Sequence, residues 1–198
     1  MPKIVNHQLK KTEIATQAIR VFSEKGYYNT KLSDIAKICN MGRTSLYKYF
    51  SNKDEIYYYI LEMGLKLYKE HYQVVDKNPE LSYLEKITTQ IHYLVTHLNG
   101  KSITKAFLDF WLMVRHNHDA LENKVSIKYN EIVNGIIKWL TMAQKNGEIK
   151  DSIDVVSTAV IIMGMIHTIS LQEMSKRNLD DETAYHSIVH LLEGLKNC

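Results

Sequence analysis

The sequence predicts an all-α protein with a small basic head and a larger helical body. Helix breakers are scarce, because the 198 residues include only 2 Pro and 8 Gly, and apolar residues recur at helical spacing through most segments. Charge is uneven, since residues 1–53 hold ten Lys and Arg against three acids, whereas residues 54–198 hold fifteen against nineteen. A net charge of +7 on one end and −4 on the rest suits a protein that presents its head to a polyanion.

The first predicted helix follows a polar start of about nine residues, which could form a frayed arm that touches the DNA backbone but which we expect to be disordered. Gly26 should end this helix, because glycine readily takes the left-handed conformation of a helix cap. Its apolar face comprises Ile14, Ala15, Ala18, Ile19 and Phe22. We expect this face to pack across the two helices that follow.

Two short helices joined by a tight turn are predicted between Thr30 and Phe50. Thr30 is the expected start of the first, with Asp34 in its first turn, and Asn40-Met41-Gly42 interrupts the helical pattern. The apolar residues expected to point inward are Leu32, Ile35, Ala36 and Cys39 in the first helix and Leu46, Tyr49 and Phe50 in the second.

The other face of the second short helix carries cations and hydroxyls and no acid. This pattern is typical of a helix-turn-helix whose second helix enters the major groove of DNA. Arg43 and Lys48 can reach phosphates or guanine edges, Thr44 and Ser45 can approach base edges, and Tyr47 can donate to a phosphate. A small helical hairpin with an ordinary solvated basic face would show the same pattern.

A long helix should follow, with Ser51 as its cap and Asp54 returning the bond of a capping box. Its free N–H groups and Lys53 lie just beyond the recognition helix and can hold a phosphate. The helix should run to Asn78-Pro79 and span roughly 36 Å, which is enough to connect head and body. The full set of candidate DNA contacts is Thr30, Arg43, Thr44, Ser45, Tyr47, Lys48, Tyr49 and Lys53.

Five further helices are predicted in the body, which makes nine in the chain. They cover residues 79–97, 101–116, 121–145, about 154–176, and a last helix opened by Asp180-Asp181-Glu182. The segment 159–169 is apolar on nearly every side, so this helix should be buried all round. In a chain of this size, such burial implies a second copy of the protein.

Several segments of the head together resemble the signature of the TetR-type bacterial transcriptional repressors. They are residues 26–30 (GYYNT), 35–36 (IA), 46–50 (LYKYF) and 53–56 (KDEI). In the turn, Asn40-Met41-Gly42 replaces the family's usual Gly-hydrophobic-Ser. Asn40 can take the left-handed conformation that the usual Gly supplies, but a serine-phosphate contact at position 42 is lost. Thr44 stands where many members carry Gly.

The resemblance implies a fold of three plus six helices and a homodimer formed through the last two helices. Gly164 would allow close approach in that interface. Two heads held about 34 Å apart would meet successive major grooves of a palindromic operator on double-stranded DNA. The resemblance also implies a small-molecule inducer pocket among the body helices, and repression as the mode of regulation.

The body also offers aromatic and thioether side chains that would suit an apolar or aromatic ligand. The candidate lining residues are Tyr93, Phe107, Phe110, Trp111, Tyr129, Met163 and His167, with Arg115 or His167 to meet an anionic group. A plain packed core would use the same residue types.

Other functions have weaker sequence support. His186 and His190 lie four residues apart, one turn beyond Glu182, and could bind a metal with it. His116 and His118, which flank Asn117, are a second candidate pair. A histidine pair on the dimer face is a simpler interpretation than a metal site. We therefore expect no metal and no cofactor. No Ser-His-Asp, paired-carboxylate or phosphate-cradling glycine motif indicates an enzyme.

The cysteine content and the length of the longest apolar run indicate the cellular location. Two cysteines, Cys39 and Cys198, do not make a disulfide framework, and the longest apolar run, residues 159–166, is too short to cross a membrane. We expect a cytoplasmic protein with a DNA-binding domain over residues 1–53 and a ligand-binding and dimerisation domain over residues 54–198. A regulator without a ligand, and an enzyme on this scaffold, remain the alternatives.

Overall fold

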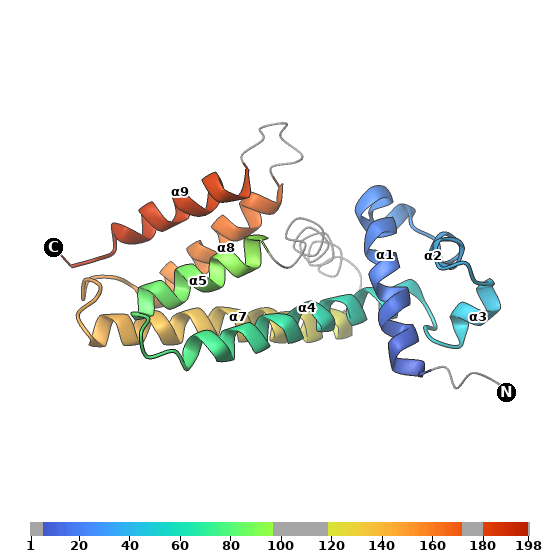
Figure 1. The fold of residues 1–198 in the computed structure, drawn as a ribbon, viewed down its shortest axis with the longest axis horizontal. Coiled ribbons are helices and arrows are strands. Elements are labelled where there is room, and N and C mark those ends of the chain that lie inside the picture. Colours follow the sequence, from blue (N-terminus) through green and yellow to red (C-terminus); the bar gives the residue numbers. More distant parts are fainter. Residues whose placement is uncertain (1–5, 97–118, 172–179, 198) are drawn as a thin grey trace.

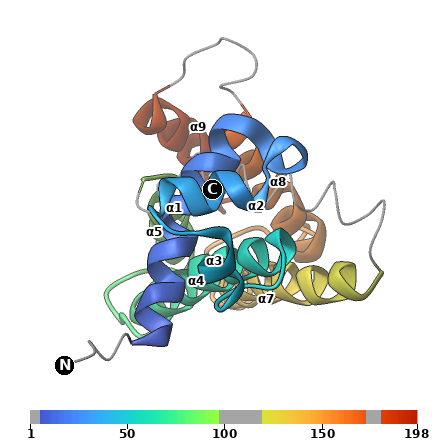
Figure 2. The same ribbon diagram turned by 90° about the vertical axis from the view of Figure 1, so that its right-hand side faces the viewer.

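The computed structural model describes residues 6–96, 119–171 and 180–197. In these ranges the chain forms eight helices and no strand beyond an isolated bridge between Ile149 and Lys196. A head made of α1 (His7–Asn29), α2 (Leu32–Ile38) and α3 (Arg43–Tyr47) lies at one end, and α4 (Lys53–Asp76) runs from it into the body (Figure 1). Viewed from the head end, α1, α2 and α3 lie in front of the body helices (Figure 2). The predicted all-α fold is confirmed.

The head is held by the apolar face of α1. Its predicted residues Ile14, Ala15 and Ala18 are fully buried, and they share one core with Leu46 of α3 and Ile60 of α4. Apolar burial of this kind is the main force that fixes short helices. The core therefore sets the angle at which α2 and α3 face solvent.

The end of α1 differs in detail from the prediction. Gly26 takes the left-handed conformation (φ 73°), but the helix resumes after this kink and ends at Asn29. Thr30 does not cap α2, because its hydroxyl donates back to the carbonyl of Gly26 at 2.7 Å. The cap residue of α2 is Lys31, whose N–H donates to the Asp34 carboxylate at 2.9 Å.

The turn between α2 and α3 matches its prediction. Asn40 takes the left-handed conformation (φ 50°), the only non-glycine residue of the described ranges to do so. The N–H of Met41 donates to the carbonyl of Ala36 at 3.0 Å, which closes α2 in the manner of a left-handed cap. Gly42 then provides the backbone cap of α3 without a side-chain bond.

The start of α4 is shifted by one residue from the predicted capping box. Asn52, rather than Ser51, is the cap, and it accepts from the N–H of Glu55 at 2.8 Å. Glu55, rather than Asp54, returns the bond by accepting from the N–H of Ser51 at 2.7 Å. Asn52 and Glu55 have the same three-residue spacing as the predicted pair, Ser51 and Asp54, and Asp54 is engaged elsewhere because it accepts from the Tyr27 hydroxyl.

The body is built from α5 (Tyr83–Thr96), α7 (Asp119–Lys145), α8 (Val155–Leu171) and α9 (Asp181–Glu193) packed beside α4. The predicted start of α5 at Pro79 is wrong, because Ser82 and Glu85 form a capping box three residues later. The helix predicted over residues 101–116 and the end of the one predicted to residue 176 lie outside the described residues. The predicted openings of α8 at Asp154 and of α9 at Asp180 are confirmed by their side-chain caps.

A second core fills the body, with Trp139 and Leu140 of α7 fully buried among residues of α5, α8 and α9. Asp76 ties the end of α4 to this core, because it accepts from Trp139 Nε1 at 2.7 Å and from Lys138 Nζ at 2.8 Å. None of the helices that the structure describes is both long and apolar enough to cross a membrane.

Candidate nucleic-acid interface and ligand site

The exposed side of α3 is fixed by its buried side. Leu46 and Phe50 are at most 1% exposed, so they anchor the helix and the turn that follows it in the head core. Arg43, Thr44, Tyr47 and Lys48 are consequently exposed, and Ser45 is half-buried. These five predicted residues therefore share one surface, which carries cationic and hydroxyl side chains.

Arg43 and Tyr47 form a pair one turn apart on this surface. The guanidinium donates to the Tyr47 hydroxyl at 3.2 Å and lies 5.7 Å from the centre of its ring. Such a contact reduces the side-chain freedom of both residues before any partner binds. The hydroxyl proton of Tyr47 remains available to donate to a phosphate.

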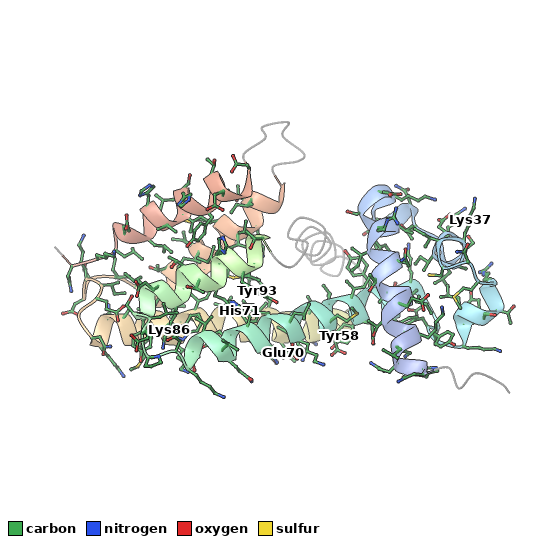
Figure 3. All side chains as sticks on the ribbon, in the orientation of Figure 1. Lys37, Tyr58, Glu70, His71, Lys86 and Tyr93 are labelled. Carbon is green, nitrogen blue, oxygen red and sulfur yellow. The ribbon has the colours of Figure 1, made fainter. Side chains whose placement is uncertain are left out.

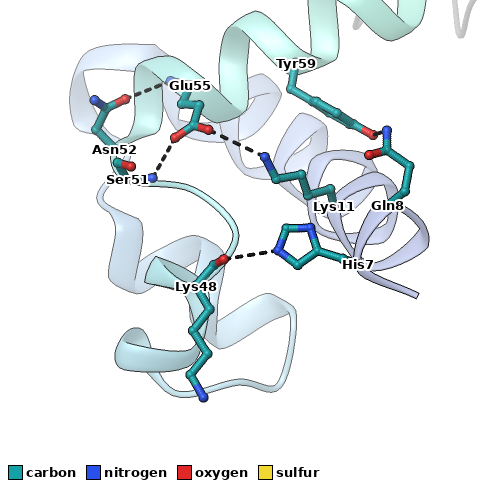
Figure 4. A network of polar contacts seen from close by, with 8 residues as sticks. All are labelled: His7, Gln8, Lys11, Lys48, Ser51, Asn52, Glu55 and Tyr59. Atoms are coloured by element: carbon teal, nitrogen blue, oxygen red, sulfur yellow. Dashed lines mark hydrogen bonds and ion pairs between the residues drawn. The ribbon is translucent and has the colours of Figure 1, made fainter. Parts of the chain in front are cut away.

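The first turn of α1 supports α3 from behind (Figure 4). His7 Nε2 lies 3.3 Å from the carbonyl oxygen of Lys48, and the His7 ring lies 4.8 Å from that of Tyr49. Tyr49 is therefore half-buried, and sequence reasoning did not find His7 as its support. The Lys48 side chain points away from this network, and its ammonium makes no bond to any residue the structure describes.

Lys53 and Thr30 direct their polar atoms into the head. Lys53 Nζ donates to the carbonyl oxygens of Tyr27, Tyr28 and Thr30 at 2.8, 3.3 and 3.2 Å, and it lies 4.2 Å from the centre of the Tyr27 ring. Burial lowers the pKa of Lys53. Thr30 is 1% exposed. A phosphate contact would require Lys53 to exchange these carbonyls for the phosphate, so its predicted role stays a prediction.

The predicted ligand residues of the body fall into two groups. Tyr129 of α7 stacks on His167 of α8 with ring centres 5.9 Å apart, and buried Met163 precedes His167 by one turn. Burial raises the pKa of Tyr129 and lowers that of His167, so the imidazole is neutral at pH 7. Four of the predicted residues lie outside the described ranges: Phe107, Phe110, Trp111 and Arg115.

Tyr93 belongs to a second group, between α4 and α5 (Figure 3). Its ring stacks on His71 with centres 3.8 Å apart and planes 6° apart, and His71 Nδ1 lies 2.7 Å from Gln90 Oε1. Gln90 is 2% exposed and donates to the backbone carbonyl of Tyr68. Sequence reasoning missed Gln90, although a polar residue within the apolar stripe of α5 was a visible signal.

Comparison with known proteins finds a family match for the head of the chain. Residues 14–60, which comprise the head and the first turns of α4, match the model described as bacterial regulatory proteins, tetR family. Over these residues the chain is similar to the TetR family. The predicted resemblance is confirmed.

Relatives of this chain are similar to it over different lengths. The fatty acid metabolism regulator protein of Bacillus subtilis (strain 168) is 26% identical over 194 residues, which cover 95% of this chain and 96% of the relative. The biofilm operon icaADBC negative transcriptional regulator IcaR of Staphylococcus epidermidis is 51% identical over 47 residues. Those residues are only 25% of IcaR, so that likeness concerns one segment.

Two solved structures share the fold over nearly the whole chain. The regulator FadR from Bacillus subtilis in complex with stearoyl-CoA has a TM-score of 0.76 at 23% identity, covering 94% of this chain and 99% of FadR. AibR in complex with isovaleryl coenzyme A and operator DNA has a TM-score of 0.71 at 21% identity, covering 92% and 97%.

The face of α8 and α9 is apolar and exposed in the single chain. Val156, Val160 and Ile161 are each at least half exposed, although α8 is largely apolar. Beside them lies an open groove of about 490 Å³ lined by Ile161, Gly164, Met165, Thr168, Ile169, Ala184, Ser187 and Ile188. This is the surface that the sequence predicts to pair with a second copy.

The histidines of α9 pair with separate acids. His186 Nε2 lies 3.1 Å from Glu182, whereas His190 Nδ1 lies 3.4 Å from Glu193. Within the described ranges no three metal-binding side chains converge on one point. His116 and His118 lie outside these ranges.

Proposed function

We propose that this protein is a cytoplasmic, dimeric transcriptional repressor of the TetR type that binds a palindromic operator and releases it when a small molecule occupies the body. The observation that carries the proposal is the exposed face of α3, where Arg43, Thr44, Tyr47 and Lys48 surround buried Leu46 at the basic end of the chain. A helix of this size fits the major groove. The proposed contacts are Arg43 and Lys48 with phosphates or guanine, Thr44 and Ser45 with base edges, and Tyr47 with a phosphate.

The ligand we propose is an acyl-coenzyme A. The supporting observations are the likeness to a fatty acid metabolism regulator over nearly the full length of both chains, and the shared fold with regulators solved with stearoyl-CoA and isovaleryl coenzyme A. In this chain, two separate clusters offer aromatic or thioether side chains suited to an acyl group: Tyr93 stacked on His71, and Tyr129 with Met163 and neutral His167. Each buried methylene of an acyl chain would contribute about 0.8 kcal/mol.

Helix α4 is the element through which we expect the ligand to act. It is tied to the head by the Lys53 and Asp54 bonds and to the body by the Asp76 and Gln90 bonds. A ligand that shifts α5 or α7 would therefore move α4 and change the separation of the two heads in a dimer. Release follows if the ligand binds the changed state more tightly than the operator-bound state. No catalytic step is part of this proposal.

The first test is selection of bound sequences from a random duplex library at two salt concentrations. We expect a palindrome with half-sites about one helical turn apart, whose binding weakens as salt rises. Salt-sensitive binding without an enriched motif would contradict sequence-specific recognition through α3.

A second test addresses the ligand. Thermal shift of the purified protein with acyl-CoAs from isovaleryl- to stearoyl-CoA should raise Tm for at least one of them, because a ligand that binds only the folded state stabilises it. If none raises Tm while the operator is still bound, the protein is a regulator with another ligand or with none.

A further inference from the structure

One buried hydroxyl of the body has no hydrogen-bond partner among the residues that the structure describes. Tyr68 of α4 is 4% exposed, and its hydroxyl neither donates to nor accepts from any atom of the residues that the structure describes. Buried hydroxyls are nearly always paired, because an unpaired one loses its bonds to water without compensation. The unpaired hydroxyl therefore needs an explanation.

The surroundings of this hydroxyl are close and aromatic. A Cβ atom added to Gly135 of α7 would lie 3.5 Å from Tyr68 Oη and 2.9 Å from the ring of Tyr72, so both tyrosines pack directly against the backbone of α7. The Tyr72 hydroxyl donates to the carbonyl of Gly135 at 3.4 Å, and the Tyr72 ring stacks on Trp139 with centres 4.2 Å apart. Tyr72 thus has a partner in the fold, whereas its neighbour one turn earlier on α4 has none.

We propose that the Tyr68 hydroxyl donates a hydrogen bond to the acyl carbonyl oxygen of the bound ligand. This assignment rests on the proposed function, in which the ligand is an acyl-CoA. Burial raises the pKa of the Tyr68 phenol, so the group is protonated and can act as a donor.

A neutral donor among aromatic rings favours a neutral acceptor. The thioester carbonyl is the polar, uncharged group at the head of the acyl chain, whereas a buried coenzyme phosphate would need a cation to offset the loss of its hydration. The bond would also join the ligand to the middle of α4, the helix that continues into the head. Tyr68 would in this way bind the acyl group and couple ligand binding to the position of α4 and of the DNA-binding head.

The test compares two ligands on three proteins. The ligands are the acyl-CoA that raises Tm most and the S-alkyl-CoA thioether of the same chain length, which lacks only the carbonyl oxygen. The proteins are the wild type, Tyr68→Phe and the matched control Tyr72→Phe, and affinity is measured by calorimetry. The wild type and Tyr72→Phe should prefer the acyl-CoA by roughly fivefold to tenfold, the value of one hydrogen bond, and Tyr68→Phe should bind both ligands equally. Without ligand, Tyr68→Phe should have a Tm no lower than the wild type.

Two results would overturn the assignment. If Tyr68→Phe still prefers the acyl-CoA as strongly as the wild type does, the hydroxyl does not contact the carbonyl. If Tyr68→Phe lowers the Tm of the ligand-free protein and leaves the preference unchanged, the hydroxyl has a structural partner instead. Failure of the wild type to bind any acyl-CoA would instead remove the proposed ligand itself, and so the two failures are distinguishable.

Discussion

Arg43 has the side chain best placed on α3 to read a base. Its contact with Tyr47 holds the guanidinium at the exposed surface, where its fork of donors can match the two acceptors of guanine. We predict that Arg43→Ala weakens operator binding by about 1–3 kcal/mol and relaxes preference at one position of each half-site. Lys66→Ala, which removes an exposed cation of the body, should change neither quantity. Equal affinity and equal preference in Arg43→Ala would show that its assigned role is wrong.

Lys53 and Lys48 are two lysines of the head with different tasks. Because Lys53 binds three carbonyls at the end of α1, Lys53→Ala should lower the free energy of unfolding by on the order of 1 kcal/mol.

Lys48→Ala should leave stability unchanged and reduce the salt dependence of DNA binding by about one unit of slope, since its free ammonium can neutralise one phosphate. Urea unfolding and binding at several salt concentrations measure both effects. A reduced salt slope in Lys53→Ala would instead support its predicted phosphate contact.

At the scale of elements, Asp76 fixes the body end of α4. Partial burial raises the pKa of its carboxyl, but hydrogen bonds from Lys138 and Trp139 outweigh this effect, so the pKa lies below its ordinary value. A carboxyl whose pKa is lowered by folding stabilises the protein above its unfolded pKa of about 3.9, and the contribution is lost as pH falls through the folded value.

The pH dependence of unfolding tests this anchor. Between about pH 5 and pH 3, the urea midpoint of the wild type should fall more steeply than that of Asp76→Asn, which has no carboxyl to protonate there. The variant should also be less stable at neutral pH, because it loses the ion pair with Lys138. Glu70→Gln, at an exposed pair on the same helix, serves as the control. Parallel curves for the wild type and Asp76→Asn would contradict the role of Asp76.

Within the described ranges, helix periodicity was sufficient to predict the elements, because the apolar faces of α1 and α5 dominate their segments. The caps were harder to place, since Ser51 and Asn52 are both good cap residues and Asp54 and Glu55 are both three positions beyond one of them. The structure decides between these alternatives through a tertiary contact, in which Tyr27 takes Asp54. Local sequence alone does not determine which of these residues caps α4.

The candidate site was predictable to a similar depth. The α3 face follows from local spacing, because Leu46 and Phe50 must point inward. The three hydrogen bonds that Lys53 donates depend on the kink at Gly26, which brings the carbonyls of Tyr27, Tyr28 and Thr30 to one ammonium. The unpaired Tyr68 hydroxyl is visible only when α4 and α7 are packed together.

At the scale of the whole molecule, operator recognition needs two heads held by one dimer. The exposed apolar face of α8 is the surface we expect to hold them. Ile161→Glu should convert the dimer to a monomer in light scattering, because the partner would have to bury an unpaired charge. Its helix content should be unchanged, since Ile161 is 57% exposed in the single chain. Val74→Glu, at an exposed apolar residue of α4, should remain dimeric, and a dimeric Ile161→Glu would place the interface elsewhere.

The central claim is that an acyl-CoA in the body controls DNA binding by the head. The most direct measurement is the fluorescence anisotropy of the selected operator, bound to the protein, as the acyl-CoA that raises Tm is added. We predict that the operator is released as the ligand saturates and that coenzyme A without an acyl group has no such effect. An operator that stays fully bound at ligand concentrations shown to saturate the protein would contradict the claim.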